Sequence, residues 1–245
     1  MTSSESEERD WSGFYRLGGV LTVLTGIQGL VSSRMASVLY ASGYPSNPEA
    51  YLQLVSQQQL RANILWSLWI AGDLLGFVPT IAAYLVLRRD NRTLALIGAL
   101  FVGFYLFYDI SVTELNSLTL VSLARDYATA ANDALKAPYV AAATYGYAAL
   151  ALQTVLSFAV GAIGWLVWSV VMLNSRVFSA WMGVVGIVVN VIGIVGSAAP
   201  VVPASFVLGL CQFLAIPLTG IWAIVIGIRL YRYGRRLQNV EAQAF

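Results

Sequence analysis

The chain has no histidine and a single cysteine, Cys211, among its 245 residues. This excludes zinc sites with nitrogen or sulfur ligands, bis-histidine haem, iron–sulfur clusters, intrachain disulfides and a Cys–His catalytic pair. We therefore expect no cofactor, no resident metal and no catalytic residue. Among cation sites, only one built from carboxylates is compatible with this composition.

Charged residues are scarce as well. They make up 11% of the chain, against about a quarter in soluble domains, whereas 58% of the residues are hydrophobic. The net charge of +2 gives no indication of a nucleic acid partner. The apolar residues lie in runs of the length that crosses a bilayer, about 20 residues each. The composition thus predicts an integral membrane protein whose partner is the lipid bilayer.

Six apolar runs predict an all-α, multi-pass bundle of six transmembrane helices within residues 13–232. Residues 1–12 are expected to form a disordered acidic tail and residues 233–245 a polar tail. The expected spans are about 14–33, 63–87, 94–118, 140–173, 178–198 and 205–230.

Two outer connections carry further signals. Within the long connection 34–62, the segment "EAYLQLVSQQQL" (49–60) predicts either a short helix lying on the outer surface or a plain structured loop. In the helical alternative, one face carries Tyr51, Leu52, Val55 and Leu60. The loop around 125–138 contains charges of both signs and is expected to be solvated.

Lys and Arg predict the orientation of the bundle. With the N-terminus in the cytoplasm, ten basic residues fall inside and four outside, so the positive-inside rule favours cytoplasmic termini. The tight inner turns at 88–92 and 174–176 predict antiparallel hairpins. The inner residues are Arg9, Arg16, Arg88, Arg89, Arg92, Arg176, Arg229, Arg232, Arg235 and Arg236, and the outer ones are Arg34, Arg61, Arg125 and Lys136.

Two acids inside the spans form the main candidate site. Asp73 lies about 17 residues before the inner turn near residue 90 and Asp109 about 18 after it, so they should share one depth in the hairpin. Tyr105 and Tyr108 could donate hydrogen bonds to Asp73. Two carboxylates in a low dielectric cannot both ionise cheaply, which is the condition for a proton- or cation-binding site. Alternatively, the acids are structural, either protonated or bonded to tyrosine hydroxyls.

Other polar residues are weaker candidates. Glu114 and Asn116 are expected nearer the outer surface, in a vestibule or at the end of the span. Asn190 and Gln212 are each about 11 residues from the outer turn near residue 201, so they should be level. They either form a hydrogen bond between helices or belong to a polar cavity shared with Asp73.

The stretch "LWIAGDLLGFVPTIAAYLVLRRDNRTLALIGALF" (68–101) resembles the DUF4386 family of six-span prokaryotic membrane proteins, a domain of unknown function. The matching features are Asp73, Asn91 and "LALIGALF". A second stretch, "YGY" (145–147) followed by "WSVVMLNSRVFSAWMGVVGIVVNVIG", is similar to the family's fourth and fifth spans. The resemblance covers about residues 13–230 and implies a multi-pass protein of a prokaryotic plasma membrane. Thr144 stands where many members have a histidine, so no role of that histidine is transferred.

Three functions are compatible with these features. The first is a non-enzymatic accessory or structural bundle that binds a partner subunit, a second copy of itself or lipid, using glycine-rich faces in the first and fifth spans. The second is a small proton- or cation-coupled transporter or channel that uses Asp73 and Asp109. The third is a membrane enzyme acting on lipid, for which no nucleophile or acid–base set has the required spacing. The first is the main prediction and the second its alternative.

Overall fold

The computed structural model describes residues 11–41, 44–199, 202 and 206–242, and every regular element within them is a helix. Six rods have the length and apolarity to cross a membrane, which confirms the predicted six-helix bundle. The spanning rods are α2 (Ser12–Leu39), α4 (Gln59–Leu87), the continuous rod 92–129, α7 (Asp133–Met172), α8 (Ala180–Ser197) and α9 (Phe206–Ala242).

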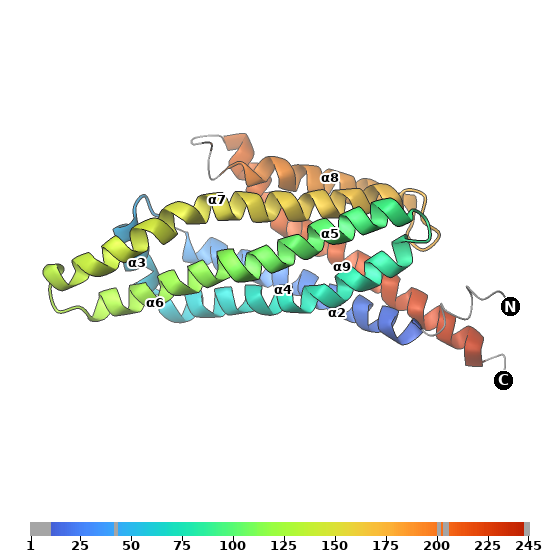
Figure 1. Cartoon of the computed structure of the whole chain (residues 1–245), viewed down its shortest axis with the longest axis horizontal. Coiled ribbons are helices and arrows are strands. Elements are labelled where there is room, and N and C mark those ends of the chain that lie inside the picture. Colours follow the sequence, from blue (N-terminus) through green and yellow to red (C-terminus); the bar gives the residue numbers. More distant parts are fainter. Residues whose placement is uncertain (1–10, 42–43, 200–201, 203–205, 243–245) are drawn as a thin grey trace.

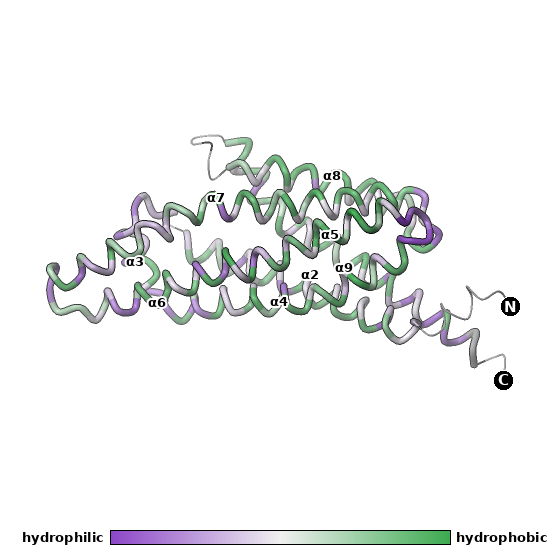
Figure 2. The backbone as a smooth tube through the Cα atoms, in the orientation of Figure 1, coloured by the Kyte–Doolittle hydropathy of each residue, from purple (hydrophilic) through white to green (hydrophobic). Residues whose placement is uncertain are grey.

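The rod 92–129 consists of three parts that follow each other without a break. These are α5 (Arg92–Tyr108), the π-helical segment η1 (Asp109–Glu114) and α6 (Leu115–Thr129). Figure 1 shows α6 and α7 extending together beyond the other rods, with the short helix α3 (Pro48–Gln57) beside them. Hydrophilic residues gather at the opposite end, at the turns that join α4 to α5 and α7 to α8 (Figure 2).

Asparagines start three of the helices. The side chains of Asn47, Asn91 and Asn132 each accept a hydrogen bond from the backbone nitrogen three residues later, at 2.8 to 3.0 Å. These N-caps satisfy backbone donors that the first helical turn leaves free. They also determine where the chain turns back, and therefore the register of the hairpins.

The helices pack in a closed ring that follows the chain order. α2 contacts α4, α4 contacts α5, α5 contacts α7, α7 contacts α8, and α8 contacts α9, which returns to α2. Each helix is thus antiparallel to both of its neighbours. The start of α2 lies against the last turns of α9, since a methyl group on Gly234 would lie 2.6 Å from the Ser12 carbonyl oxygen.

Glycines close the ring at the seam between α2 and α9. A methyl group on Gly19 would lie 2.5 Å from the backbone nitrogen of Tyr231, and one on Gly26 would lie 2.6 Å from the carbonyl oxygen of Gly220. The two backbones therefore touch directly, as small residues allow in membrane helices. These glycines are used for packing within the chain.

Five of the six rods are longer than the predicted spans, and α8 is slightly shorter. The expected loop around 125–138 is helical apart from 130–132, because α6 continues to Thr129 and α7 begins at Asp133. The predicted polar tail is also helical as far as Ala242, and the predicted acidic tail lies mostly outside the described residues. Hydropathy detects only the part of a helix that lies in lipid, so it misses polar extensions stabilised by packing.

The segment 49–60 does contain a helix, but it does not lay its apolar face on lipid. Tyr51, Leu52 and Val55 are fully buried, and α3 packs against α6 and α7. Leu60 does not share that face, since it belongs to α4 and is 74% exposed. The Tyr147 hydroxyl donates to the carbonyl of Pro45, which ties the connection before α3 to α7.

The glycine seam generates a stability prediction. We expect Gly26→Ala to lower the free energy of unfolding by about 1–3 kcal/mol, because the new methyl group meets backbone that can move only with its helix. Gly29→Ala is the matched control, since nothing lies within 4 Å of its added methyl group. Unfolding in micelles, followed by circular dichroism, measures both. Equal stability of the two variants would contradict the proposed seam.

The even number of crossings generates a topology prediction. In a Cys211→Ser background, we expect Thr93→Cys to react with a membrane-impermeant maleimide only after the cells are opened, and Ala131→Cys to react in intact cells. Both positions are exposed and lie at opposite ends of the rod 92–129. The reverse pattern would overturn the cytoplasmic assignment of the termini.

Candidate functional site

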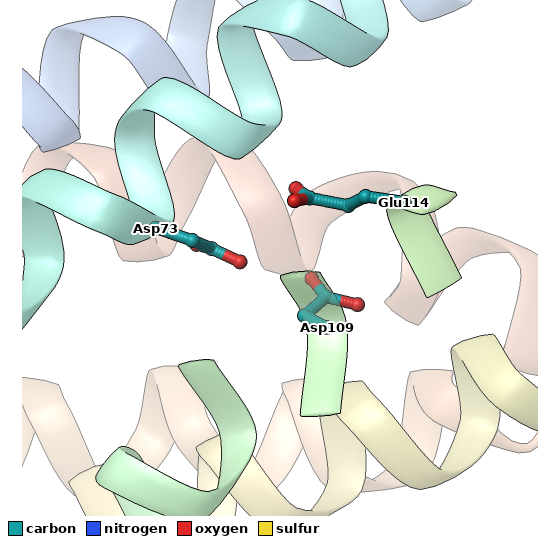
Figure 3. A group of neighbouring side chains, drawn as sticks. All are labelled: Asp73, Asp109 and Glu114. Atoms are coloured by element: carbon teal, nitrogen blue, oxygen red, sulfur yellow. The ribbon is translucent and has the colours of Figure 1, made fainter. Parts of the chain in front are cut away.

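Three acidic side chains meet inside the ring of helices. Asp73 projects from α4, and Asp109 and Glu114 project from η1, with their carboxylates turned toward a common point (Figure 3). One oxygen from each lies within 4.8 Å of the other two. Asp73 is 5% exposed, Asp109 6% and Glu114 1%. We call these three residues the carboxylate cluster.

The π-helix explains why Glu114 joins the two aspartates. In an α-helix each residue turns by about 100°, so residues 109 and 114 would point about 140° apart. A π-helix is hydrogen-bonded between residues five apart, which places such a pair on one face. Sequence reasoning placed Glu114 near the outer surface because it assumed α-helical geometry. That expectation was wrong, and no sequence signal marks the π-segment.

The cluster is only partly hydrogen-bonded. The Tyr105 hydroxyl donates to Asp73 Oδ1 at 3.2 Å. Asp73 Oδ2 and both carboxylate oxygens of Glu114 are buried without a hydrogen-bond partner in the structure. Buried polar atoms in folded proteins nearly always have a partner, so three such oxygens in one cluster need an explanation.

Basic side chains do not neutralise the cluster. The ion pairs between described residues are Arg125–Asp126 and Lys136–Asp133, both in the outer extension of α6 and α7. A carboxylate at mid-membrane costs about 2.5–3.5 kcal/mol on insertion scales. Three of them side by side also repel one another when ionised. The cluster therefore requires protons or another cation to be stable.

The geometry suits a cation of moderate size. Three atoms that all lie within 4.8 Å of one another always leave a point within about 2.8 Å of each of them, which is 4.8 Å divided by the square root of three. Ca²⁺ is bound by oxygens at about 2.3–2.6 Å and Mg²⁺ at about 2.0–2.1 Å. A small inward rotation of the side chains would reach the calcium distance.

The cluster lies between two hydrophobic cores. Toward the turn that joins α4 to α5, one core includes Val86, Leu106 and Trp168, and toward the turn that joins α6 to α7 the other includes Leu65, Leu120 and Leu150. Asp73 lies between Leu65 and Val86 on α4. Asp109 and Glu114 lie between Leu106 and Leu120 on the rod 92–129, and Ser157 lies between Leu150 and Trp168 on α7. The amide of Asn116, which is half-buried on α6, donates to the Gly146 carbonyl and to the Gln153 side chain of α7.

A cavity of about 170 Å³ lies beside the cluster, lined by residues from all six spanning rods. Asp73 and Tyr105 belong to both the cavity wall and the site, whereas Asp109 and Glu114 lie behind Asp73. Asp73 is the one charged residue among those that line the cavity in the described part of the chain. It is therefore the link between the cavity and the cluster.

The other predicted site residues lie elsewhere. Tyr108 is half-buried and its ring stacks on Phe104, and no described hydrogen bond joins it to Asp73. Asn190 lines the cavity but donates to the Gly186 carbonyl of its own helix. Gln212 is half-buried farther along α9.

The predicted pairing of Asn190 with Gln212 is wrong because the register of α8 and α9 differs from the expected one. Gly186 packs against Trp222, and Gly196 packs against the backbone of Gln212. In antiparallel helices these contacts place Asn190 level with about residue 218. Gln212 is thus roughly 9 Å away along the axis, at about 1.5 Å per residue.

The unpaired oxygens generate a pH-dependent prediction. Glu114→Gln keeps the side-chain shape and removes one charge, so we expect it to raise the free energy of unfolding by about 1–3 kcal/mol above pH 8 without divalent cations, and with it the melting temperature. The difference should shrink as the pH falls, because protonation removes the carboxylate charge that Glu114→Gln also removes. Glu49→Gln, at an exposed position, is the control. Equal destabilisation at high and low pH would make Glu114 a purely structural residue.

Comparison with known proteins identifies the family of the chain. The family model described as "Domain of unknown function (DUF4386)" matches residues 17–235, a range that contains the whole site. No curated protein and no solved structure matches the chain.

Proposed function

Because the chain belongs to the DUF4386 family, whose description names no activity, we propose a function from the site itself. The protein is a small cation-coupled transporter that binds a cation or protons at the carboxylate cluster. It resides in a prokaryotic plasma membrane, with the arginine-rich helix ends in the cytoplasm. The sequence resemblance and the positive-inside rule support this location.

One observation carries the proposal. Asp73 Oδ2 and both Glu114 oxygens are buried in a membrane bundle, and among the described residues neither a hydrogen-bond donor nor a basic side chain balances them. Acids that serve only as structural glue are expected to be hydrogen-bonded throughout. An intramembrane acid that is not so bonded is a functional candidate, because it lowers the stability of the fold and forms no hydrogen bond that would offset this cost.

The surroundings of the cluster support transport in addition to binding. The cluster adjoins a cavity in the middle of the ring, where a transported species must pass. α4 and α9, which both line this cavity, contain prolines at 79 and 217, so each lacks one internal hydrogen bond. Such positions are where membrane helices bend, and transporters often have π-turns and interrupted helices around their sites.

The accessory-subunit function has less support. It rested on the scarcity of buried charges, the lack of metal ligands of the histidine or cysteine type, and glycine faces in the first and fifth spans that were expected to pack within the chain or against a partner. Most of these glycines pack inside the chain, Gly19 and Gly26 against α9 and Gly186 against Trp222. Partner binding therefore stays a prediction without a specific surface among the described residues.

The experiment is a flux assay in proteoliposomes that contain a pH-sensitive dye. With an imposed pH gradient, we expect addition of Na⁺ or Ca²⁺ to change the internal pH through the wild-type protein. Asp73→Asn and Asp109→Asn should reduce the rate at least tenfold, because each removes a carboxylate from the cluster. Asp133→Asn, whose side chain is fully exposed in an outer ion pair, is the control and should transport normally.

Cation binding is measured separately on the same proteins. We expect Ca²⁺ to stabilise the wild type, because a ligand that binds only the folded state shifts the folding equilibrium by mass action. This stabilisation should be absent in Glu114→Gln. Absence of both flux and stabilisation in the wild type would remove the proposal. Stabilisation without flux would reduce the protein to a cation-binding membrane protein.

A further inference from the structure

The cavity beside Asp73 has walls of a different chemistry from the cluster. Trp69, Phe158 and Trp165 line it together with Tyr105. The Tyr105 and Trp165 rings meet edge to face with centroids 5.3 Å apart, and Trp69 and Phe158 do so at 6.5 Å. Because Trp69 is one helical turn before Asp73 on α4, its ring and the carboxylate lie on the same face.

Many polar groups in the cavity wall have already used a donor. The hydroxyls of Thr22, Thr25 and Thr80 and the amide of Asn190 donate to carbonyls of their own helices. Tyr105 donates to Asp73. The cavity thus presents aromatic faces, one carboxylate and neutral polar groups, with no basic side chain among its lining residues in the described structure. Its one charged group favours a cation over an anion.

This combination is the chemistry that recognises an organic cation. Aromatic faces attract a cation by 0.5–2 kcal/mol or more per contact when water is excluded, and quaternary ammonium groups are typical ligands of aromatic cages. A bare metal ion does not fit this environment, because it needs several oxygen ligands. A metal ion belongs in the carboxylate cluster, and the aromatic cavity suits a cation that carries its own apolar surface.

The size of the cavity limits the ligand. An engineered protein cavity of about 150 Å³ accommodates benzene, which has six non-hydrogen atoms. A cavity of about 170 Å³ therefore suits a cation with roughly six to ten non-hydrogen atoms. Small quaternary or tertiary ammonium compounds are in this range.

We propose that the central cavity binds a small organic ammonium cation, paired with Asp73 and enclosed by Trp69, Trp165 and Phe158. This proposal names a substrate class for the proposed transporter. It rests on the proposed function for the coupling between ammonium binding and proton release. A cation beside Asp73 favours the ionised carboxylate, so its arrival releases a proton from the cluster into the solvent. Tyr105 keeps its hydrogen bond to Asp73 and holds the carboxylate in place.

Calorimetry on the purified full-length protein in micelles tests the binding. The probes are choline and 3,3-dimethylbutan-1-ol, which has the same shape with carbon in place of the charged nitrogen. We expect choline to bind the wild type at least tenfold more tightly than its uncharged analogue. This comparison needs no variant, so it does not depend on the folding of a mutant. Equal affinity for the two probes, or no binding of either, would overturn the proposal.

Variants then locate the site. Trp165→Leu should weaken choline binding by about 3- to 30-fold, the range expected for one cation–π contact, and Asp73→Asn should abolish it. Trp181→Leu is the matched control, because Trp181 is 54% exposed and does not line the cavity. An unchanged affinity in Trp165→Leu would place choline elsewhere and refute the assignment.

The inference and the proposed function can fail separately. Glu114→Gln should keep choline binding, because Glu114 does not line the cavity, while losing stabilisation by Ca²⁺. Choline binding with proton release, measured in two buffers of different ionisation enthalpy, supports both. Ca²⁺ stabilisation without choline binding would leave the carboxylate cluster intact and overturn the organic-cation site alone.

Discussion

The burial of three carboxylates without a balancing positive charge is the constraint on which the rest of this structure depends. Lipid cannot solvate them and no basic side chain in the described part of the chain is paired with them, so the helices must provide a closed polar layer. Asp73, Asp109 and Glu114 are located where the inner and outer hydrophobic cores meet. The two cores hold the acids together on both sides, and the free energy of that packing opposes their repulsion.

The shape of the ring follows from the same constraint. A polar layer can be kept from lipid only if the six spanning rods close around it, and the last contact needed for closure is the one between α2 and α9. Gly19 and Gly26 allow these helices to touch along their backbones. A wider seam would bring lipid or water toward the cavity next to Asp73. The glycine seam is therefore distant from the acids in the sequence but supports them physically.

The cavity and the cluster differ in the chemical groups that they offer to a cation. The cluster offers oxygen ligands, whereas the cavity offers aromatic faces, and Asp73 belongs to both. In the proposed function, a proton or cation shared with Asp109 and Glu114 competes with a cation in the cavity for the one negative charge of Asp73. This competition for one side chain is the simplest physical basis for coupling two species, since each changes the affinity for the other.

The sequence by itself determined the class of the protein, the six crossings and the shared depth of Asp73 and Asp109, because hydrophobic length and residue counts along a hairpin depend only on local geometry. The inner turn at Asn91 made that count reliable. Only the tertiary structure decided which residues meet. The π-segment turned Glu114 inward, and the register of α8 and α9 separated Asn190 from Gln212. The rotation of α5 stacks Tyr108 on Phe104, without a described hydrogen bond to Asp73. These outcomes depend on helix rotation and packing between distant segments, which hydropathy does not encode.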